Sequence, residues 1–421
     1  MYISRKFNND LLWNVGSLAI LALSGILSNI LIIQFYDAEY LGVYNQVFAV
    51  YIFFSQFAVG GIHLSVLKEL SYFIQDKEKF FQIICSALIL GTVFSTLLAF
   101  ILFYFSQFIS NLLASEKIQT GLLFISPGLI FFSINKILLN ALNGLNYIKE
   151  YAIFQALRYV FIFFLLFIIC SLSLPGEYLP FALTISEFFL TIILLSYIFT
   201  KIVNIRKWYK NSNWVSKHLS FGLKSFMGGA LIEMNTRIDV IFLGYFLTDK
   251  TVGIYSFAAM LAEGVAQFPV LIRRNLDPLI GDCFSKKTPN IIEEFSSKLK
   301  FYFPLTMFFI SVIISSAVYI YINYFPSGYQ LQESLLVLIL IFIGVIINSI
   351  YRPFSGIFLQ GNKPGYHTLI SILIISFNAT GNFILIPKFG IFGAAIATSL
   401  VYILEGVLIK FFSKKLFKIK L

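Results

Sequence analysis

The sequence predicts an all-α integral membrane protein with about twelve transmembrane helices, arranged as two parallel six-helix bundles around a central cavity. Three observations lead to this fold class. The chain is 58% hydrophobic with only 12% charged residues, whereas about a quarter of a soluble domain is charged. Apolar runs of membrane-spanning length fill nearly all of its 421 residues. The two halves of the chain also share short motifs in the same order.

A helix crosses a bilayer core of about 30 Å with about 20 apolar residues. In the first half, the runs of this length lie near 11–33, 41–62, 81–105, 119–141, 152–172 and 178–200. In the second half, they lie near 221–247, 252–272, 301–323, 333–359, 366–386 and 391–411. The first run is too long for the apolar core of a signal peptide, so it is predicted to remain as a helix.

Basic residues in the connections predict the orientation of these helices. The odd-numbered connections carry only Lys117, Lys250 and Lys388, whereas the N-terminus, the even connections and the C-terminal tail carry most of the other Lys and Arg residues. Cytoplasmic loops are enriched in Lys and Arg. We therefore expect both termini to lie in the cytoplasm.

The internal repeat predicts how the helices are grouped. Residues 35–44 align without a gap on residues 246–255, and this alignment places Gly42 on Gly253. Gly144 and Gly361 end the fourth and tenth runs in the same way. An even number of helices per repeat makes the two halves parallel. The predicted domains are an N-terminal bundle over 1–205, a cytoplasmic linker over 206–220 and a C-terminal bundle over 221–421; chance similarity of apolar segments is the alternative.

The seventh run carries an unusual density of charged residues. Glu233 and Arg237 are four residues apart with the acid first, the favourable order for a pair on one helix. They form either a self-neutralised structural pair or a part of the transport path. Asp239 points away from Arg237 on a continuous helix, so it needs another partner or a proton. Asp239, together with Glu263 and Glu233, is therefore a candidate for ion coupling.

Basic residues inside other runs predict an anion site. Lys136 and Arg352 precede Gly144 and Gly361 by eight and nine residues, which places a cation at a similar depth in two equivalent helices. Pro353 follows Arg352 and is expected to kink its helix. Charged side chains inside a membrane usually face a cavity. Arg158 is a further candidate, whereas other bases near helix ends are more often interface anchors; these are Lys224, Arg273 and Arg274.

Several classes of function lack support in the sequence. The chain has no phosphate-loop motif, and Cys85, Cys170 and Cys283 do not have the spacing of a metal site. Its net charge of +11 is spread over loops without a folded basic domain, so we expect contact with membrane lipid and no nucleic-acid partner. The predicted external connections are too short to hold a catalytic domain. We expect no cofactor, no metal and no catalytic residues.

Motifs in the second half carry a family resemblance. Residues 235–244 and 252–256, followed by 360–363 and 382–398, resemble the bacterial polysaccharide flippase family. The resemblance covers essentially the whole chain and implies membership of the superfamily that also contains multidrug exporters.

The resemblance also implies a substrate and a location. The substrate would be an O-antigen or capsule repeat unit of lipopolysaccharide or polysaccharide biosynthesis, carried on undecaprenyl pyrophosphate. The protein would move it from the inner to the outer leaflet of the bacterial cytoplasmic (inner) membrane, with a polysaccharide polymerase as a partner. A central cationic cavity would bind the pyrophosphate, which fits four bases: Lys136, Arg158, Arg237 and Arg352.

Three other functions remain open at the level of sequence. A cation-coupled multidrug antiporter of the same superfamily would use Asp239 and Glu263, but the surplus of bases inside the spans argues against it. A membrane glycosyltransferase or polymerase would use external acids such as Asp37 and Glu39 but lacks an external loop. A non-transporting scaffold would not need a charged interior.

Overall fold

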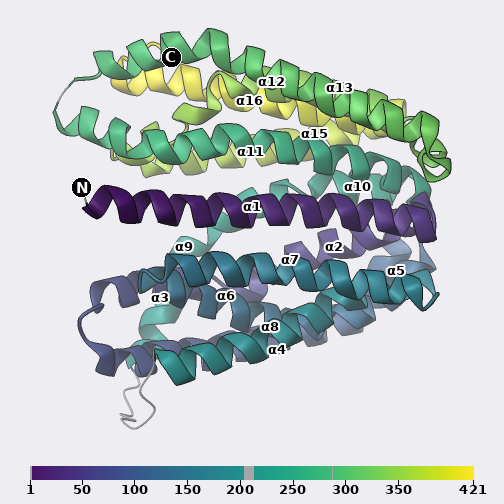
Figure 1. The fold of residues 1–421 in the computed structure, drawn as a ribbon, viewed down its shortest axis with the longest axis horizontal. Coiled ribbons are helices and arrows are strands. Elements are labelled where there is room, and N and C mark those ends of the chain that lie inside the picture. The colour runs from purple at the N-terminus through teal and green to yellow at the C-terminus, as the bar shows by residue number, and fades with distance from the viewer. Residues whose placement is uncertain (1, 203–212, 287) are drawn as a thin grey trace. The chain divides into compact units, whose positions relative to one another are not determined.

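The computed structural model describes residues 2–202, 213–286 and 288–421, and every regular element within them is a helix (Figure 1). This confirms the all-α prediction. The predicted linker over 206–220 lies partly outside the described residues.

By packing, the chain divides into two units. Unit 1 comprises Met1–Tyr36 and Val43–Met234, and unit 2 comprises Asp37–Gly42 and Asn235–Leu421. The first residues of one helix therefore belong to unit 2 while the rest of it belongs to unit 1. The packing groups 213–234 with unit 1, whereas the sequence predicted a second bundle from 221; the division into bundles remains a prediction.

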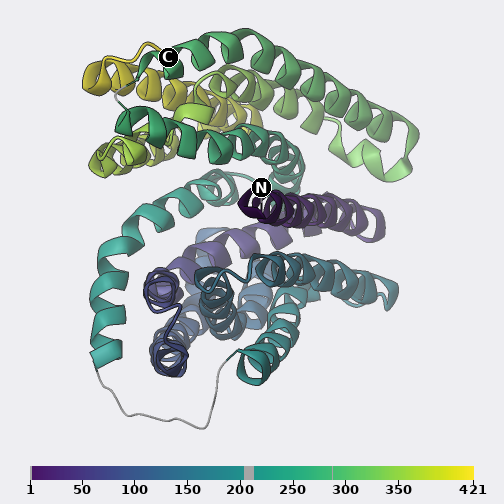
Figure 2. The same cartoon turned by 60° about the vertical axis from the view of Figure 1, so that its left-hand side comes forward.

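Unit 1 contains nine α-helices and one short 3-10 helix among its described residues. They are α1 (Tyr2–Phe35), α2 (Ala38–Val59), α3 (Ile62–Tyr72), α4 (Lys77–Leu112), α5 (Glu116–Ile125), α6 (Gly128–Gly144), α7 (Ile148–Ser171), η1 (Gly176–Tyr178), α8 (Phe181–Lys201) and α9 (Asn213–Asn235). An apolar core forms where α3, α4, α6 and α8 meet. Helix α9, in teal, bows along its length (Figure 2).

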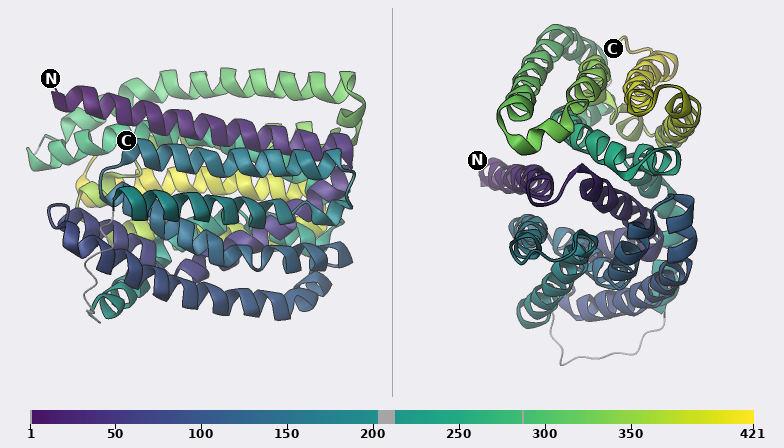
Figure 3. Two further views of the ribbon diagram at one scale, coloured as in Figure 1. Left: turned by 60° about the horizontal axis from the view of Figure 1, so that its bottom comes forward. Right: turned by 90° about the vertical axis from the view of Figure 1, so that its right-hand side faces the viewer.

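Unit 2 holds the remaining helices. They are α10 (Ile238–Phe246), α11 (Asp249–Ser285), α12 (Asn290–Tyr324), η2 (Pro326–Leu331), α13 (Ser334–Ser349), η3 (Arg352–Phe354), α14 (Ile357–Gln360), α15 (Pro364–Phe389) and α16 (Ile391–Phe417). The long helix α12 turns back through η2 into α13 (Figure 3). Side chains of α11, α14, α15 and α16 contribute to an apolar core.

The described residues contain nine helices long and apolar enough to cross a membrane, or up to eleven spans if each of two bent pairs counts as one. One bent pair joins α5 to α6 at 47°, and the other joins α13 to η3 and α14 at 49°. Pro353 lies at the second bend, which agrees with the predicted kink. The protein is a multi-pass membrane protein, and the count of twelve remains a prediction.

The predicted seventh span over 221–247 is wrong as a continuous helix. Helix α9 ends at Asn235 and α10 begins at Ile238, with Arg237 outside helical geometry at φ −124°. Within a bilayer, a break of this kind needs neighbouring side chains that satisfy the freed backbone groups. Asn378 on α15 does so, because its Nδ2 donates to Asn235 O at 3.4 Å and to Asn235 Oδ1 at 3.1 Å. The helical spacing assumed for Glu233 and Arg237 therefore does not hold.

The two repeat-related glycines of the sequence analysis pack against each other in unit 2. A Cβ added at Gly42 would overlap the carbonyl oxygen of Asp249, and one added at Gly253 would overlap the carbonyl oxygen of Ala38. The start of α2 and the start of α11 therefore cross in backbone contact, which only small residues permit.

Replacing Gly42 by alanine is expected to lower the midpoint of thermal unfolding, because the new methyl group has no space at this crossing. Overpacking of this kind costs about 1–3 kcal/mol. The matched control is Gly264→Ala on α11, where nothing lies within 4 Å of an added Cβ. Equal midpoints for the two variants would contradict the close crossing.

Helix α9 is anchored to unit 1 by polar side chains near its start. His218 is fully buried, with Nδ1 2.9 Å from Ser65 Oγ on α3 and Nε2 3.1 Å from Ile83 O on α4. One turn earlier, Trp214 Nε1 donates to Gln82 Oε1 at 3.2 Å. Burial lowers the pKa of His218, although the hydrogen bond to Ile83 acts in the opposite direction. The imidazole is therefore neutral in the folded protein near neutral pH.

Unit 1 is expected to lose stability as the pH falls below about 6.5, the usual pKa of histidine. Burial, and then the charge of Lys136, lowers the pKa of His63 on α3 to about 3, and the pKa of His218 moves in the same direction. The unfolded chain then takes up protons that the folded chain does not, so the free energy of unfolding falls by up to about 1.4 kcal/mol per pH unit for each histidine. Thermal unfolding of the purified protein between about pH 7.5 and about pH 5.5 measures this slope.

The control for this prediction replaces both side chains by glutamine, which cannot titrate. A His63→Gln, His218→Gln protein that loses stability as steeply as the wild type would refute the assignment.

Candidate functional site

The first charged cluster lies inside unit 1, where α6, α7 and α8 meet. Arg158 on α7 pairs with Glu187 on α8: Nε lies 2.8 Å from Oε1, and Nη2 donates to Oε2 at 3.2 Å. Asn135 Nδ2 on α6 donates to Glu187 Oε2 at 2.7 Å, and Thr191 Oγ1 donates to Asn135 Oδ1 at 3.0 Å. The Glu187 side chain is only 4% exposed. Both carboxylate oxygens thus hold a buried guanidinium in place.

A similar cluster occurs in unit 2 on α13, η3 and α16. Arg352 Nη1 donates to Glu405 Oε2, and Asn348 Nδ2 donates to the same oxygen at 2.8 Å. In both units, an asparagine from the fourth predicted span of a half and a glutamate from the sixth predicted span meet an arginine. The arginines, however, come from different predicted spans, the fifth for Arg158 and the tenth for Arg352.

Sequence reasoning missed Glu187 and Glu405. Each is the single acid within a long apolar run, at 178–200 and 391–411. A lone acid at such a place must meet a base or a proton, and this signal would have found both.

Lys136 on α6 has a different environment from the two arginines. Its Nζ donates to Gln56 Oε1 at 3.2 Å and lies 5.4 Å from the centre of the Phe132 ring. Glu233 on α9 interacts with it electrostatically, but no ion pair joins Lys136 to a carboxylate in the part of the chain that the structure describes. Lys136 is thus a partly buried base that makes no ion pair among the described residues.

Arg237 lies at the break between α9 and α10 and contacts α11. Its Nη2 donates to Glu263 Oε2 at 3.2 Å, with both side chains between a fifth and a third exposed. Of the four predicted substrate-binding bases, Arg158, Arg237 and Arg352 thus each face a carboxylate. The net positive charge of these side chains is therefore smaller than the number of basic residues in the sequence indicated.

Asp239 is a buried acid in unit 2. Its Oδ2 accepts a hydrogen bond from Tyr255 Oη on α11, and its Oδ1 accepts one from Val240 N at 2.9 Å. Thr398 Oγ1 on α16 lies 3.0 Å from Tyr255 Oη. No ion pair is present at Asp239 among the described side chains. A carboxylate in such a place can gain a proton or a small cation.

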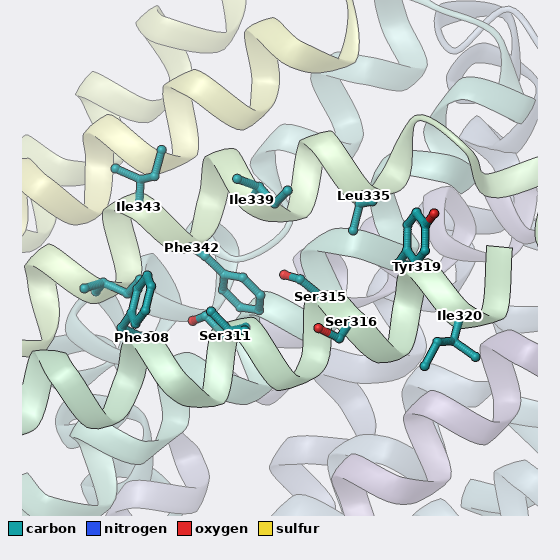
Figure 4. A pocket seen from close by; sticks show the side chains of 12 residues that line it. Phe308, Ser311, Ser315, Ser316, Tyr319, Ile320, Leu335, Ile339, Phe342 and Ile343 are labelled. Carbon is teal, nitrogen blue, oxygen red and sulfur yellow. The ribbon is translucent and has the colours of Figure 1, made fainter. Parts of the chain in front are cut away.

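A lateral groove of 590 Å³ lies between α12 and α13 (Figure 4). Its lining is apolar except for hydroxyl groups on α12, and none of the lining residues is charged. In Figure 4, Ser311, Ser315 and Ser316 of α12 face the side chains of Leu335, Ile339 and Phe342 on α13. This groove suits hydrocarbon and offers no charge to a phosphate group.

The described residues contain no group of three or more His, Cys, Asp or Glu side chains that could hold a metal ion. The charged clusters instead offer guanidinium, ammonium and carboxylate groups inside membrane-spanning helices. Such groups can bind an anion and can exchange a proton or a cation.

Two relatives by sequence are archaeal. An uncharacterised membrane protein of Methanocaldococcus jannaschii is 27% identical over 371 residues, which cover 78% of this chain and 68% of that protein. A probable low-salt glycan biosynthesis flippase of Haloferax volcanii is 25% identical over 203 residues, which cover 48% of this chain and 42% of that protein.

Two solved structures show a similar fold. An inward-facing multidrug resistance transporter of the MATE family in the MOP superfamily has a TM-score of 0.75, at 13% identity and with 96% of this chain and 97% of that chain covered. The lipid II flippase MurJ in an inward closed conformation has a TM-score of 0.73, at 16% identity and with 96% of this chain and 87% of that chain covered. The protein therefore has the fold of MOP superfamily transporters.

The family model described as polysaccharide biosynthesis protein matches residues 9–272 of this chain, which is more than half of its 421 residues. This match confirms the family resemblance that the motifs indicated. The chain belongs to the polysaccharide biosynthesis protein family.

Proposed function

We propose that the protein is a flippase for lipid-linked oligosaccharide. It moves repeat units of the O-antigen or capsule type, carried on undecaprenyl pyrophosphate, from the inner to the outer leaflet by alternating access. The observation that carries this proposal is Lys136, because a base inside the membrane that makes no ion pair among the described residues suits a phosphate group. The family match and the glycan flippase among the relatives support the same substrate class.

The four basic residues have two roles in this proposal. Lys136 is the proposed phosphate ligand of unit 1 and Arg352 that of unit 2, whereas Arg158 and Arg237, held by Glu187 and Glu263, contribute positive potential within their own units. Since phosphate groups bind guanidinium and ammonium strongly where water is scarce, the same bases would hold the head group while the lipid tail remains in hydrocarbon. Such a protein moves its substrate without changing its covalent bonds, so it is not an enzyme.

A second part of the proposal is coupling to a proton or sodium gradient. Asp239 is the leading coupling group, because it is buried, accepts hydrogen bonds from Tyr255 and Val240 and makes no ion pair among the described residues. Glu263 and Glu233 are the other candidates; Glu263 already pairs with Arg237.

The proposed setting is the bacterial cytoplasmic (inner) membrane with both termini in the cytoplasm. The uneven distribution of Lys and Arg between the two sets of connections supports this orientation. A polysaccharide polymerase that consumes the flipped repeat unit is the proposed protein partner.

A cation-coupled multidrug antiporter is the second candidate, and Asp239 favours it. A buried carboxylate without an ion pair can bind a cationic drug, and the similar MATE structure has the same fold. Binding measurements separate the two candidates. Protein in lipid nanodiscs is titrated with undecaprenyl-pyrophosphate-linked oligosaccharide and with ethidium.

The flippase proposal expects binding of the lipid-linked oligosaccharide that Lys136→Ala weakens. Binding of ethidium alone, abolished by Asp239→Asn, would replace the flippase by the antiporter.

A further inference from the structure

We propose that Glu405 occupies the anion site of unit 2 as a substitute for the phosphate of the substrate, so that Arg352 is released only to a diphosphate. This inference rests on the proposed function for its substrate class. It assigns a specificity-determining role to a residue that the sequence analysis did not single out.

The Arg352 and Glu405 pair is held less firmly than its counterpart in unit 1. Both hydrogen bonds that reach Glu405 in the described residues converge on one oxygen, Oε2. In contrast, both carboxylate oxygens of Glu187 contact the guanidinium of Arg158. The exposed fractions differ in the same sense: 27% and 13% for Arg352 and Glu405, but 12% and 4% for Arg158 and Glu187.

Two further basic side chains lie close enough to Glu405 to interact with it. Arg273 on α11 and His367 on α15 both interact electrostatically with Arg352 and with Glu405. Arg273 also pairs with Asp277 on the same helix, with Nε 3.5 Å from Oδ2. Two guanidinium groups and an imidazole thus lie near Glu405, with Asp277 as a second acid beside Arg273.

A diphosphate is the anion best suited to displace Glu405 from Arg352. An arginine has five N–H donors, and phosphate accepts them in parallel pairs. A diphosphate has enough charge and enough oxygens to contact Arg352 and Arg273 together. A carboxylate or a single phosphate that replaces Glu405 gains little binding free energy, because it makes contacts similar to those that are lost. Asn348 Nδ2 still binds the released carboxylate, so Glu405 is not left without a partner.

The test measures the affinity of the purified full chain for inorganic pyrophosphate and for orthophosphate by calorimetry. Glu405→Gln removes the competing charge and keeps an oxygen for Asn348. Its affinity for pyrophosphate is expected to rise about tenfold, because the site no longer has to open first. Its affinity for orthophosphate is expected to rise more, so that the ratio of the two affinities becomes smaller than in the wild type.

Three variants make the test specific. Glu405→Gln with Arg352→Ala is expected to lose the gain in affinity. Glu294→Gln is the control, because it removes an acid from an exposed pair with Lys298 on α12, and it is expected to show no gain. Glu405→Asp keeps the charge but shortens the side chain, and its affinity for pyrophosphate is expected to rise severalfold. This variant provides the test if Glu405→Gln does not fold.

The proposal is overturned if neither Glu405→Gln nor Glu405→Asp binds pyrophosphate more tightly than the wild type, including the case in which none of them binds it. The proposal is also overturned if the variant Glu405→Gln with Arg352→Ala still binds pyrophosphate more tightly than the wild type. Leaflet exchange of the lipid-linked substrate is measured separately. If the wild type exchanges the substrate but the variants gain no affinity for pyrophosphate, the role of Glu405 is refuted and the flippase proposal stands. If the variants gain affinity but the wild type exchanges no substrate, the role of Glu405 stands and the flippase proposal is refuted.

Discussion

Replacing Lys136 by alanine is expected to reduce binding and leaflet exchange of the lipid-linked oligosaccharide more than any other single change of a basic residue. The reason is that Lys136 is a cation of the candidate site that no carboxylate in the described residues neutralises, so its charge is available to the substrate. Removing one partner of a desolvated charge pair costs about 2–5 kcal/mol of binding. The dissociation constant of the wild type and the variant measures the effect directly.

Two controls distinguish charge from packing at this position. Lys136→Arg keeps the charge and is expected to retain most of the binding. Lys149→Ala removes a lysine whose Nζ lies 5.0 Å from the Trp13 ring centre, at the start of α7, and is expected to bind like the wild type. If Lys136→Ala binds the oligosaccharide as tightly as Lys149→Ala, Lys136 is not a ligand.

The second large effect is on stability. Glu187→Ala would leave the Arg158 guanidinium buried in unit 1 without its acid, and breaking a buried ion pair in this way costs about 3–5 kcal/mol. The expected result is a marked fall in the midpoint of thermal unfolding in detergent. Asn135 and Thr191 cannot compensate, because Asn135 Nδ2 loses its carboxylate acceptor as well.

A double variant separates this electrostatic cost from the loss of side-chain volume. Arg158→Met with Glu187→Leu replaces the pair by apolar groups of similar size, a change that is often neutral or stabilising. The double variant is therefore expected to unfold at a higher temperature than Glu187→Ala. An unfolding midpoint of Glu187→Ala close to that of the wild type would show that the pair is not essential to unit 1.

The fold was predictable from the sequence to a large extent, because apolar length, basic asymmetry and the internal repeat are local properties. The seventh span shows where this reasoning fails. Its composition suits a helix over 221–247, but the break at 236 and 237 depends on Asn378, which is distant in sequence and satisfies the freed carbonyl of Asn235.

The candidate site was predictable only in part, for a related reason. Lys136 and Asp239 can be singled out from the sequence because a charge inside an apolar run needs an explanation. Which acid meets Arg158 or Arg352 depends on how helices pack, and the distance along the chain from Arg352 to Glu405 gives no hint of the contact. Glu187 and Glu405 stand out in the sequence as single acids within apolar runs, but the sequence does not indicate which base each of them contacts.

Leaflet exchange in reconstituted vesicles tests the central claim most directly. The protein is inserted into lipid vesicles that contain undecaprenyl-pyrophosphate-linked oligosaccharide, and a membrane-impermeant reagent reports how much of the glycan reaches the outer leaflet. The proposed function predicts exchange that depends on the protein, leaves the oligosaccharide covalently unchanged and is weakened in Lys136→Ala. Vesicles in which the glycan stays in its leaflet, under an imposed proton or sodium gradient of either direction, would contradict it.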